Sequence, residues 1–508
     1  MTIAKVNTAA VVGLEGHLIE VEVDISSGLP SITVVGLPDA AVQEAKERVR
    51  AAIRNSNYVV PRRRVTINLA PADLKKEGPG YDLPIALGIL ISSEQLNYDA
   101  SKALFLGELS LDGSLRHTHG ILPMVAFAQK RGFPQVFVSS ADVKEAALIE
   151  EIEVIPANSL AELVAHLRGD IPIQPYVLDS ASRANMVLES NVTDFSEIKG
   201  QQHVKRALEI CAAGGHNILM SGPPGSGKTM MARSLPSLLP LMSAEEALDV
   251  SKIYSVSGLL PSDSPSVVQR PFRAPHYTIS HAGLVGGGRN PKPGEITLSH
   301  HGVLFLDELA EFDRSALEAL RQPLEDKIVT ISRAQGSVTF PANFTLVAAM
   351  NPCPCGYHSD DTRVCRCSSG EISRYQKKIS GPLLDRIDIF TAVPPVEYQK
   401  LFDQTPLESS KEIRSRVEAS RQIQQQRFKG TSISCNAAMS PVEIRKFCQL
   451  SSYNQQLLRT ATKQLLLSAR SFHRIFKLSR TIADLENAAE IETSHLTEAI
   501  QYRARTME

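Results

Sequence analysis

Apolar and polar positions alternate in three short segments near the start of the chain. Residues 18–23, 31–35 and 65–69 show the two-residue period of half-buried strands. In residues 40–54 the apolar positions instead recur every three or four residues, and most basic side chains lie on the other faces, which predicts an amphipathic helix. Together these elements predict a mixed α/β unit over residues 1–170.

A second pattern begins near residue 195. An apolar run at 217–220 precedes a glycine-rich segment and a helix pattern, and the apolar runs at 302–306 and 344–350 predict further strands. We therefore expect a second α/β unit, over residues 195–396.

The remaining parts of the chain differ in composition. Residues 171–194 contain Ile-Pro-Ile-Gln-Pro and then a polar run rich in Ser and Asn, which is typical of a linker. Residues 397–508 have a helical pattern, and Ser440-Pro-Val-Glu443 is a capping box with proline at the first helical position.

Composition narrows the function classes. A chain of 508 residues exceeds the reach of one core, and its formal net charge of −1 means that any nucleic-acid affinity must come from local patches. Nothing resembles a membrane span or the apolar region of a signal peptide, so we expect a cytoplasmic protein without a membrane partner. Seven cysteines, an odd number with four clustered, agree with a reducing compartment.

The glycine-rich segment has the pattern of a phosphate-binding loop between a strand and a helix. Its glycines let backbone N–H groups turn toward a phosphate, while Lys228 reaches the outer phosphate oxygens and Thr229 holds Mg²⁺. The expected nucleotide-binding residues are Gly222, Pro223, Pro224, Gly225, Ser226, Gly227, Lys228 and Thr229.

The strand pattern at 302–306 ends in two carboxylates and resembles a Walker B segment. Asp307 would hold Mg²⁺ through water, and Glu308 would polarise the attacking water. The alternative is a buried strand followed by an acidic helix N-terminus. With the phosphate loop upstream, the pair predicts nucleotide hydrolysis.

Four cysteines form the other chemical cluster. Cys353-Pro-Cys355 and Cys365-Arg-Cys367 are separated by nine residues and can supply four thiolates to a tetrahedral structural Zn²⁺. Free thiols are the main alternative, because a reducing cytoplasm disfavours a disulfide.

The order of segments in the first unit resembles the proteolytic domain of Lon-type proteases. The loop at 77–82 leads into a helix pattern at 83–91, as in that family. Gly80, however, stands where the family carries its nucleophilic serine, and no lysine occurs from Ala103 to Gln129. Because a Ser–Lys dyad cannot form, we expect a protease fold without protease activity.

Six segments in the rest of the chain carry specific motifs. They are Arg270-Pro-Phe-Arg-Ala-Pro-His276, Pro293-Gly-Glu-Ile296, Gly302-Val-Leu-Phe-Leu-Asp-Glu-Leu309, Arg321-Gln-Pro-Leu-Glu325, Ala349-Met-Asn-Pro-Cys-Pro-Cys-Gly356 and Gly381-Pro-Leu-Leu-Asp-Arg-Ile-Asp388. Together they resemble the magnesium-chelatase-like AAA+ proteins and, within them, the YifB/ComM group. The resemblance implies a Lon-like N-terminal domain, an AAA+ core with a parallel sheet that binds ATP and Mg²⁺, and a C-terminal helical lid.

The same resemblance implies a homo-hexameric motor acting on single-stranded and branched DNA. In the ComM type this motor is a helicase that drives branch migration during natural transformation. A metal-chelatase motor subunit acting on a partner protein is the rival interpretation. An ATP-dependent protease is opposed by the missing dyad, and a nucleotide-gated scaffold by the presence of Glu308 and Arg386.

The resemblance also assigns further residues. Asn351 matches sensor 1, for which the alternative is a simple Asn-Pro turn. Arg386 matches an arginine finger that enters a neighbouring subunit's site, for which the alternative is a surface Arg–Asp pair. Arg474 is the expected sensor 2, although Arg470 is close enough to leave the choice open.

A hairpin pattern at 328–340 turns at 334–336. In related ATPases such an insertion projects into the pore of the ring. Arg333 near its tip, with Arg289 or Lys292 from the preceding insert, would then follow DNA phosphates. Basic residues of 40–54 and Arg62-Arg63-Arg64 offer another DNA surface, for which a solvated face is the alternative.

Overall fold

The structure is a computed structural model that describes residues 3–76, 78–178, 193–260, 266–288, 291–333, 336–358, 363–395, 407–431, 433–465 and 468–503. The chain divides into two units. The N-terminal unit comprises Met1–Leu188 and Ser243–Val268, and the C-terminal unit comprises Glu189–Met242 and Gln269–Glu508.

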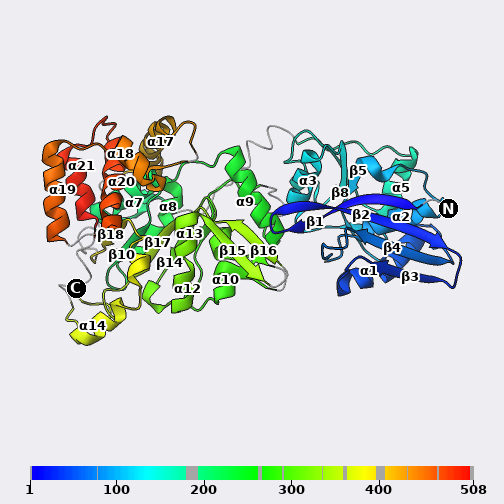
Figure 1. Cartoon of the computed structure of the whole chain (residues 1–508), viewed down its shortest axis with the longest axis horizontal. Coiled ribbons are helices and arrows are strands. Elements are labelled where there is room, and N and C mark those ends of the chain that lie inside the picture. Colours follow the sequence, from blue (N-terminus) through cyan, green and yellow to red (C-terminus); the bar gives the residue numbers. More distant parts are fainter. Residues whose placement is uncertain are drawn as a thin grey trace. The chain divides into compact units, whose positions relative to one another are not determined.

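The N-terminal unit is built on a seven-stranded mixed sheet with the strand order β3-β4-β2-β1-β5-β8-β9 (Figure 1). The pairs β1·β2 and β2·β4 are antiparallel, and the other neighbours are parallel. The predicted strands at 18–23, 31–35 and 65–69 lie in β2, β3 and β4. The strands are β1 Ala4–Val12, β2 Glu15–Ser26, β3 Ser31–Val35, β4 Arg64–Ala70, β5 Ala103–Phe105, β8 Gln135–Ser139 and β9 Glu153–Ala157, with a small pair β6 Glu108–Leu109 and β7 Leu115–Arg116.

Helices bury their apolar faces against this sheet. The helix expected at 40–54 is α1, and its buried residues are the predicted ones, Val42, Ala45, Val49, Ala52 and Ile53. The helices are α1 Ala40–Asn55, α2 Asp82–Ser92, α3 Ile121–Lys130, α4 Val143–Ala146 and α5 Leu160–Arg168, with the 3₁₀ turn η1 Ala100–Lys102.

One helix of this unit comes from much later in the sequence. The helix α9, Ala244–Ser257, lies within the range expected for the ATPase core, yet it packs on α3 in the N-terminal unit. The Ser255 hydroxyl donates to the buried Glu145 carboxylate at 2.6 Å. The start of the expected linker also lies on this unit, since the Tyr176 N–H donates to the Val154 carbonyl at 2.8 Å; residues 179–192 are outside the described ranges.

The C-terminal unit has a five-stranded, fully parallel sheet with the order β11-β14-β17-β10-β18 (Figure 1). This confirms the expected parallel core. Because the strands run in one direction, the segments that follow β10, β14 and β17 meet at one edge of the sheet. The strands are β10 Ile218–Ser221, β11 Phe272–Arg273, β14 Val303–Leu306, β17 Thr345–Met350 and β18 Ile389–Ala392.

Helices and two small antiparallel pairs complete the core. The expected hairpin is β15 Ile328–Arg333 and β16 Gly336–Pro341, and the other pair is β12 Gly286–Gly287 and β13 Lys292–Pro293. The helices are α7 Gln202–Gly214, α8 Lys228–Leu238, α10 His281–Val285, α11 Glu295–Leu298, α12 Arg314–Ala319, α13 Arg321–Asp326, α14 Ser369–Gln376 and α15 Gly381–Leu384, with the 3₁₀ turns η2 Phe195–Glu197 and η3 Leu309–Glu311.

The last part of the chain is helical, as expected, over its described residues. Its apolar residues Val417, Ile475 and Leu496 share one core with Leu208 of α7 and Ile218 of β10, so this helical part packs on the elements of the parallel-sheet core. The capping box at Ser440 and Glu443 is present. The helices are α17 Ser410–Arg427, α18 Pro441–Phe447, α19 Ser452–Gln464, α20 Ala469–Leu485 and α21 Thr493–Gln501, with η4 Asn436–Ala438. Across the described part of the chain, a search found no helix with both the length and the apolarity to cross a membrane.

Candidate active site

The phosphate loop connects β10 to α8 at the carboxyl edge of the parallel sheet. Gly225 and Gly227 have φ of +78° and +89°, and a Cβ at either position would meet nothing within 4 Å. Gly222 is required for a different reason, since a Cβ there would lie 2.1 Å from the Val393 carbonyl oxygen. The loop therefore needs glycine both for its left-handed turns and for its close approach to β18.

Lys228 begins α8 and is only 8% exposed. Its ammonium donates to the carbonyl oxygens of Gly222 at 2.7 Å and Pro223 at 2.8 Å, and to Oδ1 of Asn351 at 3.3 Å. Burial lowers the pKa of Lys228, and the negative charges of Asp307 and Glu308 act against this shift. The structure thus brings together the predicted lysine and the predicted sensor 1 residue.

Two carboxylates follow β14 at the same edge. The Thr229 hydroxyl donates to Oδ2 of Asp307 at 2.8 Å, so the two residues expected to hold Mg²⁺ are in contact. Glu308 lies in the left-handed region at φ 52°, and its N–H donates to Oδ1 of Asp307 at 3.0 Å. Its carboxylate is exposed and forms no ion pair with another described residue.

These residues fit a bound nucleotide. The Ser226 hydroxyl is buried and has no hydrogen-bond partner among the described residues, and the space beside Gly225 and Gly227 is open. The Lys228 ammonium holds three neutral acceptors of this chain, which negatively charged phosphate oxygens can replace. The arrangement can bind a nucleoside triphosphate and place a carboxylate beside its outer phosphate.

The expected arginines lie at the other end of the strands. Asn217 and Asp388 immediately precede β10 and β18, and the Asn217 N–H donates to Oδ2 of Asp388 at 3.1 Å. Arg474 of α20 pairs with this buried Asp388. Burial alone would raise the pKa of Asp388, but the charge of Arg474 and the hydrogen bond from His216 hold it well below its usual range.

Arg386 is also held at this edge. Its guanidinium donates to the carbonyl oxygens of Arg321 at 3.1 Å and Pro382 at 2.7 Å and pairs with Glu325, and the residue is 7% exposed. Arg470 lies 3.6 Å from the same Glu325. Neither Arg386 nor Arg474 is brought to the phosphate loop of its own chain, and their expected roles stay predictions.

The four expected cysteines converge. The Sγ atom of Cys353 lies 3.3 Å from that of Cys355 and 3.7 Å from that of Cys365, and all four Sγ atoms, including that of Cys367, lie within 4.8 Å of one another. Zinc–sulfur bonds of about 2.3 Å in a tetrahedron require separations of roughly 3.8 Å, so the donor set fits Zn²⁺. Backbone N–H groups of Tyr357 and Arg366 lower the pKa of Cys355 to about 6.

The cysteine segment touches the phosphate loop. The Gly356 N–H donates to the Cys353 carbonyl at 3.0 Å, which closes a turn. Gly356 has φ +86°, and a Cβ there would lie 2.5 Å from Cδ of Pro224. The turn therefore packs directly on the loop that is expected to bind phosphate.

The structure describes some, but not all, of the residues that are expected to contact DNA. Arg333 ends β15 and is exposed, as is Lys292 of β13, which pairs in register with Gly287; Arg289 lies outside the described residues. A Cβ on Gly287 would lie 3.5 Å from Nη2 of Arg333, so the two antiparallel pairs are neighbours. Arg62, Arg63 and Arg64 are exposed on the N-terminal unit.

The helix α14 contributes contacts that no motif in the sequence predicts. Gln376 of this helix donates to the carbonyl of Pro352 at 3.2 Å, and Lys378 pairs with Glu311 at 3.1 Å, three residues after the catalytic candidate Glu308. The only signal available was the excess of basic residues around 363–378, which no motif rule singled out.

In the N-terminal unit, Gly80 precedes α2, which is the helix expected at 83–91. A Cβ on Gly80 would lie 3.5 Å from Cγ2 of Thr118. Gly80 supplies no nucleophile and the segment 103–129 contains no lysine, so the Ser–Lys pair of the Lon-type order is missing at these positions.

Comparison with known families identifies the three main segments. The family model described as "Magnesium chelatase, subunit ChlI" matches residues 194–401, and the model "Magnesium chelatase, subunit ChlI C-terminal" matches 407–503. A third model, "Subunit ChlI of Mg-chelatase", matches residues 21–142 of the N-terminal unit.

Individual relatives agree with these matches. The chain is 43% identical over 510 residues to competence protein ComM of Haemophilus influenzae, covering 99% of this chain and 98% of the relative. It is 43% identical over 508 residues to the uncharacterized protein YifB of Escherichia coli, covering 99% and 97%. A magnesium-chelatase 38 kDa subunit of Cereibacter sphaeroides is 28% identical over 174 residues, covering 31% and 52%. The chain therefore belongs to the YifB/ComM family of magnesium-chelatase-like AAA+ proteins.

Proposed function

We propose that this protein is an ATP-driven hexameric DNA motor that promotes branch migration of recombination intermediates during natural transformation. The observation that carries the ATP-dependent part is the meeting of Lys228, Thr229, Asp307 and Asn351 at one edge of the parallel sheet. The identity to a competence protein over nearly the whole chain supports the competence-related part.

ATPase activity follows from membership of the family, with ATP and Mg²⁺ as cofactors. Lys228 would exchange its carbonyl partners for phosphate oxygens, and the backbone around Gly225 and Gly227 would turn N–H groups toward them. Thr229 and Asp307 would hold the Mg²⁺, which neutralises charge on the phosphates when bound. Glu308 is the carboxylate available to orient a water against the outer phosphate, and Asn351 would share that task.

Assembly into a ring explains the position of the remaining arginines. Arg386 and Arg474 lie at the strand ends opposite the phosphate loop, where they serve no nucleotide of their own chain. An arginine supplied by a neighbouring subunit stabilises charge on the transferring phosphate. In such a ring Arg386 would exchange Glu325 for a neighbour's nucleotide, and Arg474 would approach the same nucleotide from the lid.

The DNA would pass beside the two antiparallel pairs. Arg333 and Lys292 are exposed on neighbouring pairs, and with Arg289 they would contact successive phosphates. We also propose that the N-terminal unit is a Lon-like domain without protease activity, since Gly80 offers no nucleophile.

We propose that the four cysteines bind one structural Zn²⁺. Four thiolates close the tetrahedron and leave no position for water or substrate. Protein purified without chelator should contain about one zinc per chain by this four-thiolate rule, and Cys365→Ser should lower both zinc content and melting temperature. Metal-free protein with full stability would identify the cluster as four free thiols.

A metal-chelatase motor subunit is the second candidate, because the matched family models are named for that enzyme. The two functions differ in what stimulates turnover. A DNA motor should hydrolyse ATP several-fold faster when single-stranded or branched DNA is added, whereas a chelatase subunit should respond to its partner protein and not to DNA. Turnover that is identical with and without DNA would contradict the DNA-motor proposal.

A further inference from the structure

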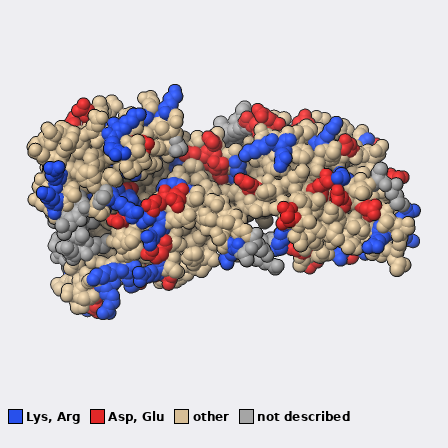
Figure 2. Space-filling view, in the orientation of Figure 1, with Lys and Arg blue, Asp and Glu red and all other residues tan. Residues whose placement is uncertain are grey.

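Basic side chains gather around α14 in the C-terminal unit. Residues 363–378 contain five Lys or Arg and one acidic residue, whereas the whole chain has a net charge of −1. We call Arg314, Arg366, Arg374, Lys377 and Lys378 the α14 basic surface; all five are exposed. Figure 2 shows Lys and Arg gathered over the part of the unit where Figure 1 places α14.

Most of these side chains form no ion pair with a described carboxylate. Lys378 pairs with Glu311 at 3.1 Å, while the other four form no ion pair with another described residue. Several cations on one face repel one another. An ordinary solvent-exposed face instead mixes positively and negatively charged side chains. The excess of positive charge is therefore suited to binding a polyanion.

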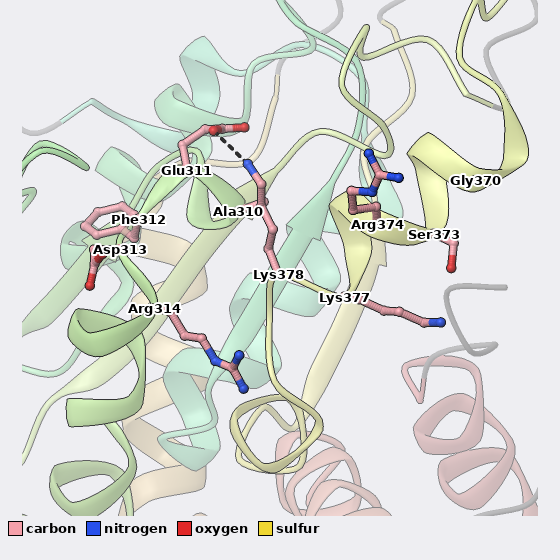
Figure 3. A pocket seen from close by; sticks show the side chains of 10 residues that line it. All are labelled: Ala310, Glu311, Phe312, Asp313, Arg314, Gly370, Ser373, Arg374, Lys377 and Lys378. Carbon is pink, nitrogen blue, oxygen red and sulfur yellow. Dashed lines mark hydrogen bonds and ion pairs between the residues drawn. The ribbon is translucent and has the colours of Figure 1, made fainter.

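The surface is hollowed as well as basic. A cavity of about 680 Å³ has residues 310–314 as one wall and α14 with Lys377 and Lys378 as the other. Arg314, Arg374 and Lys377 surround it, and Lys378 reaches across to Glu311 (Figure 3). Glu311 and Asp313 are the acidic residues of its lining, so cations outnumber anions by four to two.

The inner face of α14 is bonded to the nucleotide site. Gln376 donates to the carbonyl of Pro352 at 3.2 Å, and Pro352 directly follows Asn351, the expected sensor 1 residue. The α14 segment is thus linked by Gln376 to the residue after Asn351 and by Lys378 to the segment that follows Asp307 and Glu308.

From this arrangement we propose that the α14 basic surface is a second DNA contact, distinct from the expected pore residues, which binds the phosphate backbone and transmits its occupancy through Gln376 to the nucleotide site. The inference rests on the proposed DNA motor and names an additional binding site for it. Phosphates entering the cavity compete with Glu311 for Lys378, so binding changes the contacts of the segment next to Glu308.

Binding is tested by neutralising two outer cations. In the double variant Arg374→Gln/Lys377→Gln, the DNA is a fluorescein-labelled single strand or four-way junction. Each lost phosphate contact should reduce the slope of the logarithm of the DNA association constant against the logarithm of the salt concentration by about 0.7–0.9. The matched control is Arg459→Gln/Lys463→Gln on α19, which removes two exposed cations from another helix of the same unit and should leave the slope unchanged. Melting temperatures of both variants separate loss of contact from loss of fold.

Transmission is tested by Gln376→Leu, which deletes the amide that donates to the Pro352 carbonyl and nearly keeps the size of the side chain. DNA affinity should remain at the wild-type value, while the stimulation of ATP turnover by DNA should fall several-fold. If the wild type binds no DNA, the proposed motor fails. If it binds DNA but Arg374→Gln/Lys377→Gln keeps the wild-type slope, or Gln376→Leu keeps full stimulation, the present inference fails and the motor proposal stands.

Discussion

At the scale of single residues, the site separates binding of the nucleotide from its hydrolysis. Lys228 is buried and holds three acceptors, so it supplies a fixed positive charge, whereas Glu308 is exposed at the end of β14. In the proposed mechanism Lys228 would contribute to nucleotide affinity and Glu308 to hydrolysis. This difference gives a prediction for each residue.

We expect Glu308→Gln to retain ATP binding and to lose turnover by about 10²–10⁴-fold, because an amide cannot accept the proton of the attacking water. Lys228→Ala should instead lose binding itself. Titration with a fluorescent ATP analogue and a phosphate-release assay distinguish the two variants. Wild-type turnover in Glu308→Gln would refute the assignment.

His300 provides a test of acid sensitivity. It is buried, and its Nδ1 accepts a hydrogen bond from the Asn343 N–H at 3.0 Å, which links the segments before β14 and β17. Burial, with a smaller effect of His301, lowers the pKa of His300 to about 3. In an unfolded chain the side chain takes up a proton below pH of about 6.5, so the unfolded state gains protons first as the pH falls.

Through His300, the free energy of unfolding of the wild-type protein should therefore fall by roughly 1.4 kcal/mol per pH unit as the pH falls from about 6.5 toward 4. His300→Asn keeps an acceptor but cannot be protonated, so its stability should decline less steeply over the same range. Urea unfolding of both proteins at several pH values measures the difference. Parallel curves would show that His300 is not the group responsible.

At the scale of elements, the turn Cys353–Gly356 joins the cysteine cluster to the phosphate loop. Its position matters because Gly356 combines a left-handed backbone with close contact to Pro224. A displacement of this turn would move the loop itself. We therefore expect the cysteine cluster to fix the position of the phosphate loop, besides any contribution to stability.

Gly356→Ala should raise the KM for ATP several-fold, since the left-handed conformation alone costs about 1–2 kcal/mol for a residue with a Cβ and the Cβ also displaces Pro224. Gly370→Ala is the matched control, because a Cβ there meets nothing within 4 Å and the position is helical. Equal KM values for the two variants would contradict this positioning of the phosphate loop. Steady-state ATPase kinetics provide the comparison.

The elements that could be predicted from sequence are those defined by local pattern. The phosphate loop, β14 and the cysteine pairs depend on neighbouring residues, so their chemistry was visible before the fold. The pairing of Arg386 with Glu325 and the packing of α9 on α3 join residues far apart in the chain, and no local rule indicates them. The role of α14 was missed for the same reason, because the Gln376 amide gains meaning only beside the carbonyl of Pro352, 24 residues away in the sequence.

At the scale of the whole molecule, one chain lacks a complete catalytic site in this account. Its phosphate loop and its Arg386 lie at opposite ends of the same strands, so two subunits must meet to combine them. Turnover should then depend on assembly.

Mixing two inactive variants tests this dependence. Arg386→Ala keeps an intact phosphate loop, and Lys228→Ala keeps an intact Arg386. In mixed rings some interfaces pair the two intact halves, so turnover should partly recover, whereas each variant alone stays inactive. No recovery, together with light scattering that shows only monomers under all nucleotide conditions, would contradict the ring.

The central claim is that this protein uses ATP to move DNA, and branch migration of a synthetic four-way junction tests it most directly. With ATP, the wild-type protein should convert the labelled junction into two duplex products. Glu308→Gln should bind the junction and leave it intact. The account would be contradicted if the junction persists with the wild-type protein and ATP. It would also be contradicted if Glu308→Gln converts the junction into duplex products equally well.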